Sequence, residues 1–326
     1  MTNVIEAREL RKRFKARGAT VEAVRGVSFT VPQGEIFGFL GPNGAGKTTT
    51  LRMLTTLLTI DEGEARVAGL DVASAAAKVR QQIGYVSQLG GADNLATGRE
   101  NLMLQGRLYG RERADVAARV EELLDLLDLA SFAERQVKTY SGGQKRRLDV
   151  ALGIVHEPQV LFLDEPTTGL DPQNRANLWQ HVRTLRDRGV TVFLTTHYLE
   201  EADALCDRVT IIDDGTIVAE GSPRELKRDI VGDAVVLRVG DEDGTRARVE
   251  TLLADAPFVR STTQAEDGEL HCYVDDGPAA LPELLRRFDA AQITLRAISL
   301  SEPTLDDVFL AKTGRSLRDR EAGAAA

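Results

Sequence analysis

The sequence is poor in cysteine and lacks long apolar runs. Cys206 and Cys272 are the only cysteines among 326 residues, which is too few for a disulfide framework or for a zinc site built from cysteines. Apolar stretches such as residues 160–163 are far shorter than the roughly 20 residues that a membrane-spanning helix needs. The N-terminal residues MTNVIEAREL lack the apolar core of a signal peptide. These absences exclude a protein embedded in the membrane and favour a cytoplasmic one.

Basic residues are also in deficit. The chain has 41 Lys and Arg residues against 50 Asp and Glu residues, a formal net charge of -9. This balance argues against nucleic acid or anionic lipid as a general partner, so we expect neither nucleic-acid binding nor direct lipid binding. A hydrophobic content of 42% and a charged content of 28% are ordinary for a globular protein and exclude disorder over the whole chain. At about 150 residues per domain, the length suggests two domains.

The first two thirds of the chain have the pattern of an α/β domain. Strands are predicted at residues 4–14, 21–31, 35–40, 64–67, 160–163, 190–194, 209–212 and 216–219, and a helix at 47–58. Residues 94–158 are predicted to form a helical insert, with one helix over about 143–155. A second helix of the insert is expected to carry an apolar face made of Val116, Val120, Leu123, Leu124 and Leu127.

The last third follows a different order of elements. Strands are predicted at residues 234–239, 259–263, 269–274 and 293–300, with helices at 245–254 and 279–288. This βαββαβ order resembles a ferredoxin-like fold. A short helix is expected at 305–310, and residues 313–326, charged and then rich in Ala and Gly, are predicted to be a disordered tail.

A phosphate-binding loop is the strongest chemical signal. The run Gly41-Pro42-Asn43-Gly44-Ala45-Gly46-Lys47-Thr48 matches G-x-x-x-x-G-K-[ST] and lies between a predicted strand and a predicted helix. Glycines let backbone N–H groups approach phosphate oxygens, and the helix N-terminus adds a positive dipole end. Lys47 is expected to reach the β- and γ-phosphates, and the Thr48 hydroxyl to bind Mg²⁺. The motif therefore predicts binding of a nucleoside triphosphate.

A second motif ends the strand predicted at 160–163. The apolar run is followed by Asp164 and Glu165, and taken alone the two acids equally fit a capped strand end before Pro166. Together with the phosphate loop, the pattern indicates the magnesium side of a nucleotide site. Asp164 is then expected to hold the metal through water, and Glu165 to polarise an attacking water molecule.

The run Tyr140-Ser141-Gly142-Gly143-Gln144 resembles the signature sequence of ABC-transporter ATPases. It lies between the two phosphate motifs and at the start of a predicted helix, as in that family. Four further family features occur in the family's order: Phe14, Gln88, the segment Gly169-Leu170-Asp171, and His197. The resemblance covers about residues 4–226 and implies a P-loop NTPase fold of the ABC nucleotide-binding type, with a helical insert.

The resemblance also implies roles for individual residues. The aromatic Phe14 would stack on adenine, Gln88 would contact Mg²⁺ and sense the partner, and His197 would act as a switch. The implied catalytic residues are Lys47, Gln88, Glu165 and His197. The implied metal site is made of Thr48, Gln88 and Asp164. The implied nucleotide-binding residues are Phe14, Gly41, Pro42, Asn43, Gly44, Ala45, Gly46, Lys47, Thr48, Thr49, Ser141, Gly142, Gly143 and Gln144.

The signature residues form a second phosphate cradle in a chain with one complete nucleotide set. The family resolves this by head-to-tail dimerisation, so we expect a homodimer in which Ser141 and Gly143 of one subunit close on ATP held by Lys47 of the other. Three positions depart from the family pattern. Tyr140 stands where leucine is commonest, Phe14 where tyrosine is commonest, and Gly169 where a small-residue run is usual.

Residues 299–310 narrow the family further. They resemble the ending of ATP-binding subunits of the daunorubicin-resistance type. That resemblance implies the ATPase half of a multidrug or antibiotic exporter, peripheral at the cytoplasmic face of the cell membrane and paired with a separate permease. Residues 88–95 and 100–109 are expected to receive the permease.

The expected domains are an ABC ATP-binding domain at 1–228, with its insert at about 94–158, and an accessory α+β domain at 229–312. The accessory domain carries no evident catalytic set, because His271 and Cys272 are adjacent on a strand and point opposite ways. We expect it to stabilise or regulate the homodimer. Three alternatives remain: an ABC ATPase for lipid or polysaccharide transport, a soluble ABC ATPase, and a P-loop kinase, against which the signature and His197 argue.

Overall fold

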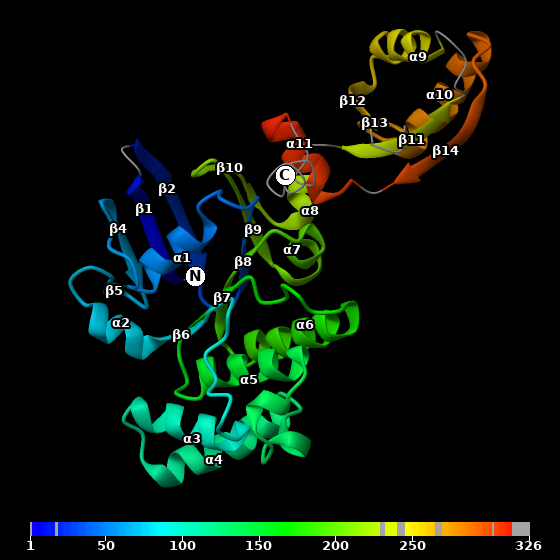
Figure 1. Ribbon diagram of the computed structural model, residues 1–326. Helices are drawn as coiled ribbons and strands as arrows, with labels where there is room; N and C mark the ends of the chain where they lie inside the picture. Colours follow the sequence, from blue (N-terminus) through cyan, green and yellow to red (C-terminus); the bar gives the residue numbers. More distant parts are fainter. Residues whose placement is uncertain are drawn as a thin grey trace. The chain divides into compact units, whose positions relative to one another are not determined.

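The computed structural model describes residues 2–16, 19–228, 232–239, 245–264, 269–301 and 303–314 (Figure 1). The chain divides into two compact units, one up to Glu220 and one from Gly221 onward. The predicted disordered tail falls almost wholly outside the described residues, and the predicted domain boundaries stay predictions. No helix among the described residues is long and apolar enough to cross a membrane.

The main sheet of the first unit has six strands. Their order is β10 (Thr216–Gly221), β9 (Arg208–Asp213), β3 (Ile36–Leu40), β8 (Thr191–Thr196), β7 (Val160–Asp164) and β6 (Ile83–Val86). The strands from β9 to β6 are parallel, and β3, β7 and β8 are buried at every residue. Parallel strands covered on both faces read as continuous apolar runs, which is how the sequence predicted them.

The register of these strands brings the phosphate loop, the acidic motif and His197 to one edge of the sheet. Leu40 of β3 pairs with Thr196 of β8, and Asp164 of β7 pairs with Thr195. The carboxyl ends of the three strands are therefore level. Ligands of open α/β sheets bind outside this edge, so the register alone brings the phosphate loop and the acidic motif together.

A second, antiparallel sheet covers one face of the main sheet. It contains β2 (Ala19–Pro32), β1 (Asn3–Ala16), β4 (Glu62–Val67) and β5 (Leu70–Asp71), in that order. Phe29 of β2 lies with its ring centroid 5.6 Å from that of Phe37 and 5.9 Å from that of Phe193. This buried aromatic cluster joins the two sheets and anchors the strand that leads into the phosphate loop.

The helix after that loop is shorter than the sequence predicted. α1 spans Lys47–Leu54, whereas the apolar pattern predicted residues 47–58. Thr55 closes the helix, because its hydroxyl donates to the carbonyl of Leu51 (3.0 Å) and Thr56 has a φ of 63°. A left-handed residue cannot continue a right-handed helix. α2 (Ala76–Gln82) follows before β6.

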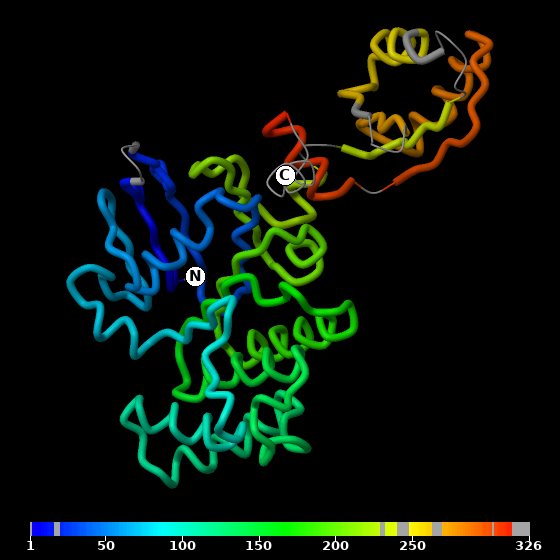
Figure 2. The backbone as a smooth tube through the Cα atoms, viewed as in Figure 1, coloured from blue at the N-terminus to red at the C-terminus, as the bar shows by residue number. Residues whose placement is uncertain are grey.

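The predicted helical insert is confirmed. Figure 2 follows the chain from β6 through α3 (Gly98–Leu108), α4 (Arg113–Leu126) and α5 (Gly142–Ile154), then back to β7. Two short 3-10 helices, Ala130–Phe132 and Val137–Thr139, lie between α4 and α5. The predicted apolar face of α4 is buried at all five positions. α6 (Pro172–Asp187) and α7 (Leu199–Leu205) complete this unit.

The second unit has the predicted βαββαβ order. Its elements are α8 (Pro223–Leu226), β11 (Asp233–Val239), α9 (Thr245–Ala254), β12 (Val259–Gln264), β13 (Leu270–Val274), α10 (Gly277–Ala290), β14 (Leu295–Ser301) and α11 (Leu305–Thr313). The antiparallel sheet has the order β12-β13-β11-β14. Cys272 lies in the apolar core, whereas His271 lies 4.0 Å from Asp307 of α11.

Candidate active site

The phosphate loop joins β3 to α1 and depends on its glycines. A Cβ on Gly41 would lie 2.2 Å from the carbonyl oxygen of Ile212, and one on Gly46, whose φ is 101°, would lie 2.5 Å from that of Ala23. Neither position accepts a side chain, because backbone atoms cannot withdraw. Lys47 is buried beneath the loop and donates from Nζ to the carbonyls of Gly41 (2.8 Å) and Pro42 (3.1 Å).

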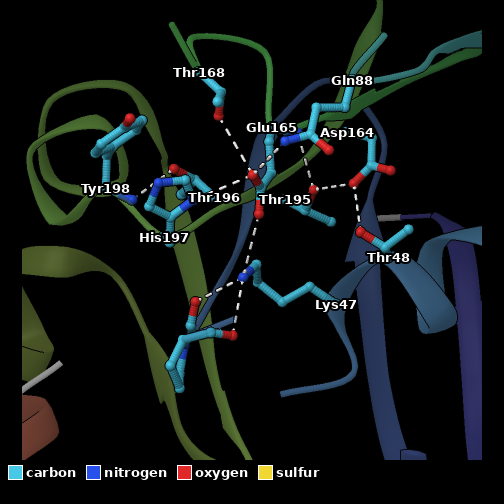
Figure 3. Close-up of polar contacts among 12 residues, drawn as sticks. Lys47, Thr48, Gln88, Asp164, Glu165, Thr168, Thr195, Thr196, His197 and Tyr198 are labelled. Carbon is cyan, nitrogen blue, oxygen red and sulfur yellow. Dashed lines mark hydrogen bonds and ion pairs between the residues drawn. The ribbon is translucent and has the colours of Figure 1, made fainter. Parts of the chain in front are cut away.

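An oxygen-rich group lies beside the loop. Thr48 of α1 donates from Oγ1 to Asp164 Oδ1 (2.9 Å), and Thr195 of β8 donates to the same oxygen (2.7 Å). The Asp164 side chain is buried, and Figure 3 shows it between the two hydroxyls. A carboxylate and a hydroxyl this close form the oxygen donor set that Mg²⁺ accepts in proteins.

The Glu165 carboxylate is the centre of the site. Its Oε2 accepts hydrogen bonds from Gln88 Nε2 (3.2 Å) and Thr168 Oγ1 (3.3 Å). His197 Nδ1 lies 3.3 Å from the same oxygen, and Lys47 Nζ lies 3.4 Å from Oε1. These side chains converge from four separate segments of the chain (Figure 3).

The surroundings of Glu165 keep it ionised. Burial by itself would raise its pKa, but the nearby His197 and the Lys47 ammonium outweigh burial and lower the pKa below its ordinary value. Glu165 is therefore a carboxylate at neutral pH. An ionised carboxylate can accept a proton from a water molecule, which a protonated carboxyl group cannot do.

The backbone at Glu165 is strained. Its φ is 46°, in the left-handed region that residues other than glycine rarely adopt. Such a conformation costs about 1–3 kcal/mol and persists only where its surroundings impose it. Here the Glu165 N–H donates to both the backbone oxygen and the hydroxyl of Thr195, each at 3.1 Å. Thr195 therefore orients both acids of the motif.

The signature residues begin α5. Ser141 Oγ accepts from the Gln144 N–H (3.3 Å), and the Gln144 side chain accepts from the Ser141 N–H (2.9 Å), which is a capping box. The unusual Tyr140 is buried; its hydroxyl donates to the carbonyl of Phe132 (2.8 Å), and its ring packs edge-on against the Phe132 ring. Tyr140 is thus a packing residue of the insert.

The structure brings together six of the expected site residues: Lys47, Thr48, Gln88, Asp164, Glu165 and His197. The other residues of the phosphate loop, from Gly41 to Thr49, lie in its turn or in the first turn of α1. Phe14 lies apart on β1, 40% exposed, with Lys12 Nζ 5.8 Å from its ring centroid. Ser141 and Gln144 bond to each other in the capping box, with Gly142 and Gly143 between them.

Three residues of the site were not predicted from the sequence: Thr195, Thr168 and Arg146. Thr195 lies near the end of β8 and Thr168 in the turn after β7, and both positions commonly hold threonine. The two residues act through contacts with residues about 30 and three positions away. Arg146 follows the signature on α5, where a charged residue reads as solvent-exposed, yet its side chain is buried. The one sequence signal that could have found Arg146 is the helical periodicity of residues 142–154, which places it on the buried face of α5.

Comparison with known proteins identifies the chain. Residues 24–168 match the ABC transporter family, and residues 221–313 match the C-terminal domain of DrrA1-3-like ATP-binding proteins. The daunorubicin/doxorubicin resistance ATP-binding protein DrrA of Streptomyces peucetius is 46% identical over 307 residues, which cover 93% of this chain and 92% of that protein. The chain belongs to the DrrA family of ABC transporter ATP-binding proteins.

Two further relatives and a solved structure agree. The DrrA2 protein of Streptomyces coeruleorubidus is 41% identical over 322 residues (99% of this chain, 98% of that protein). The Nod factor export ATP-binding protein I of Burkholderia lata is 41% identical over 315 residues (97% and 98%). A dimeric post-hydrolysis structure of the ATP-binding cassette MJ0796 with ADP and Pi has a TM-score of 0.62 at 25% identity, covering 67% of this chain and 98% of that one. The chain is thus a nucleotide-binding ATPase of the ABC type, and cassettes of this type act as dimers.

Proposed function

We propose that this DrrA-family protein energises the export of a drug of the daunorubicin type. Two copies would bind ATP between them at the cytoplasmic face of the membrane and drive a separate permease. The observation that carries the proposal is the 46% identity to the daunorubicin/doxorubicin resistance protein over nearly the whole of both chains. The Nod factor export relative, at 41% identity, favours a second candidate, export of a different cargo.

The proposed roles of the site residues follow from its geometry. Lys47 neutralises the β- and γ-phosphates, Glu165 accepts the proton of the attacking water, and His197 orients Glu165 and the γ-phosphate. Gln88 donates to Oε2 of the same carboxylate and would hold it in place. Phosphoryl transfer to water needs positioning and charge neutralisation more than covalent chemistry, and an ionised Glu165 surrounded by donors meets that need.

Magnesium fits the donor set of this site. Thr48, Asp164 and the side-chain oxygen of Gln88 would hold it, and the bound ion would neutralise phosphate charge. Within the described residues no group of three or more His, Cys, Asp or Glu side chains could hold a metal ion. Mg²⁺ is characteristically bound by one or two protein ligands together with phosphate oxygens and water, so this sparse set favours Mg²⁺ brought in with the nucleotide.

The dimer supplies the remaining contacts to the nucleotide. We propose that residues 141–144 at the positive end of α5 cover the γ-phosphate held by the Lys47 of a second copy, with Phe14 against the adenine. The capping box leaves Gly142 and Gly143 at the first turn of α5, where unpaired N–H groups attract an anion.

A group of exposed leucines is the proposed permease surface. Leu89 is 98% exposed, Leu95 71%, Leu104 60% and Leu108 71%. All four fall within residues 88–95 and 100–109, close in sequence to Gln88. Exposed apolar side chains grouped in this way are typical of an interaction surface. We further propose that the C-terminal domain stabilises or regulates the dimer, so its removal should weaken dimerisation or alter the ATPase rate.

The test of export uses the chain with its neighbouring membrane protein. Both are co-expressed, and inverted membrane vesicles are prepared. ATP-dependent uptake of daunorubicin is measured in parallel with uptake of a lipid-linked sugar, which represents the different cargo of the second candidate. Daunorubicin uptake that is abolished by Glu165→Gln supports the proposal. Uptake of the sugar alone would support the second candidate, and ATP hydrolysis at the wild-type rate in Glu165→Gln would remove Glu165 as the base.

The permease surface is tested by a matched pair of variants. Leu89→Asp should abolish co-purification of the membrane protein, because it places a charge in an apolar interface. Leu57→Asp changes a leucine that is 56% exposed but lies three residues beyond the end of α1, outside residues 88–95 and 100–109. It should leave co-purification intact. Equal recovery of the membrane protein with both variants contradicts the proposed surface.

A further inference from the structure

Two charged residues lie buried on one face of α5, three positions apart. Arg146 is 6% exposed and Asp149 is 9% exposed. Residues at this spacing are neighbours on a helix surface. Burial of charge is costly and needs partners, so the contacts of each side chain indicate what the pair does.

Arg146 contacts three backbone carbonyls beside the site. It donates from Nη1 to Ser87 (2.6 Å), from Nε to Pro166 (2.7 Å) and from Nη2 to Asp164 (3.1 Å). Ser87 directly precedes Gln88, and the other two residues flank Glu165. A guanidinium has five donors in a rigid fork, so it can span three carbonyls at once.

Asp149 holds the other side of the segment that carries Gln88. Its Oδ1 accepts from the Gly91 N–H (3.0 Å), and a Cβ on Gly90 would lie 2.6 Å from its Oδ2. Ser87 and Gly90 also close a turn, through the Gly90 N–H and the Ser87 carbonyl (3.2 Å). The segment from Ser87 to Gly91 is therefore attached to α5 on both sides of Gln88.

We propose that Arg146 and Asp149 are positioning residues that align Gln88 with Glu165 and pass the movement of α5 to this contact. The inference rests on the roles proposed above for Gln88 and Glu165. Since α5 begins with the signature residues, a displacement of the helix on ATP contact shifts both ends of the hydrogen bond between Gln88 and Glu165.

Two observations separate this role from simple packing. Among the described residues, the hydrogen bonds of the Arg146 side chain go to carbonyls next to the site, and the carboxylates of Asp149, Glu201 and Asp164 act on its charge without a direct hydrogen bond. In addition, Asp149, Gly90 and Gly91 line a cavity of about 190 Å³ together with Gln105 of α3. The attachment thus adjoins the part of α3 that carries exposed leucines of the proposed permease surface.

The primary test compares adjacent arginines in the full chain. Arg146→Lys keeps the charge but has one ammonium, which cannot span three carbonyls. We expect kcat to fall at least tenfold, while the affinity for a fluorescent ATP analogue changes less than threefold. Arg147→Lys is the matched control. Arg147 bonds to the carbonyls of Leu127 and Asp128, and its Nη1 lies 3.9 Å from the Asp128 carboxylate, so these contacts lie within the insert and away from Glu165. This variant should keep the wild-type kcat.

A double variant tests whether Arg146 acts through Gln88. Adding Arg146→Lys to Gln88→Ala should lower kcat by less than threefold, because the contact that Arg146 aligns is already gone. Asp149→Asn should retain most activity, since the amide oxygen still accepts from Gly91, whereas Asp149→Ala should lower kcat about tenfold. The asparagine rescue keeps the test decisive if Arg146→Lys fails to fold.

The inference is overturned by a wild-type kcat in Arg146→Lys, by fully additive effects with Gln88→Ala, or by equal losses in Asp149→Asn and Asp149→Ala. Glu165→Gln is assayed in parallel. If Glu165→Gln hydrolyses ATP normally, the proposed function of the site fails first. If Glu165→Gln is inactive but Arg146→Lys is normal, only the present inference fails.

Discussion

Thr195 offers a sharp test of how the acidic motif is held. The side chain is fully buried on β8; its hydroxyl donates to Asp164 (2.7 Å) and accepts from the Glu165 N–H (3.1 Å). Thr195→Val keeps the shape of the side chain and removes only this hydroxyl. The Asp164 carboxylate then loses one of its two hydroxyl donors, while the Glu165 N–H keeps its bond to the Thr195 backbone oxygen.

The expected loss follows from that count of hydrogen bonds. A hydrogen bond to a charged group contributes about 1.5–3 kcal/mol, and the backbone bond at Glu165 survives. We therefore expect Thr195→Val to lower the free energy of unfolding by about 1.5–3 kcal/mol. At about 2–4 °C per kcal/mol for a domain of this size, Tm should fall by roughly 3–12 °C. Because the strained backbone of Glu165 is then held by one of its two bonds to Thr195, kcat should fall as well.

Thr210→Val is the matched control. Thr210 is fully buried on β9 of the same sheet, but its hydroxyl has no hydrogen-bond partner among the described residues. Removing an unpaired buried hydroxyl should leave the stability unchanged or raise it slightly. Urea unfolding and thermal melting of the two variants provide the comparison. Equal stability of Thr195→Val and wild type, or equal losses in both variants, would refute the reasoning.

Three further outcomes are expected. Gly46→Ala should destabilise the protein and weaken binding of an ATP analogue at least tenfold, whereas Gly34→Ala, with φ 82° and nothing within 4 Å of its Cβ, should cost only about 1–2 kcal/mol of strain. Burial lowers the pKa of His156 to about 4, whereas the histidine of the unfolded chain gains its proton below about pH 6.5. The free energy of unfolding should therefore fall by about 2 kcal/mol between pH 7 and pH 5, measured by urea unfolding, and it should fall less in His156→Gln. Tyr140→Phe removes the hydroxyl that bonds to Phe132, so Tm should drop by a few degrees while kcat stays near wild type.

Local patterns predicted most of the fold. Buried parallel strands are continuous apolar runs, and the strands β3, β7 and β8 were predicted from them. The predicted end of α1 was wrong. The hydroxyl of Thr55 and the left-handed backbone of Thr56 end the helix, although the apolar pattern of the sequence continues beyond them. Short elements such as β6 were not predicted, since four residues carry too little periodicity.

The sequence by itself determined the kind of site. The phosphate loop, the paired acids and the signature each need particular residue types in consecutive order, so each can be read without a structure. Only the tertiary structure decided how the site is held. Thr195 meets Asp164 through strand register, Arg146 meets Ser87 and Pro166 through the packing of α5, and neither contact leaves a periodic trace. Contacts between residues far apart in sequence depend on packing geometry. The residues that carry the chemistry could therefore be predicted from the sequence, and the residues that hold them in place could not.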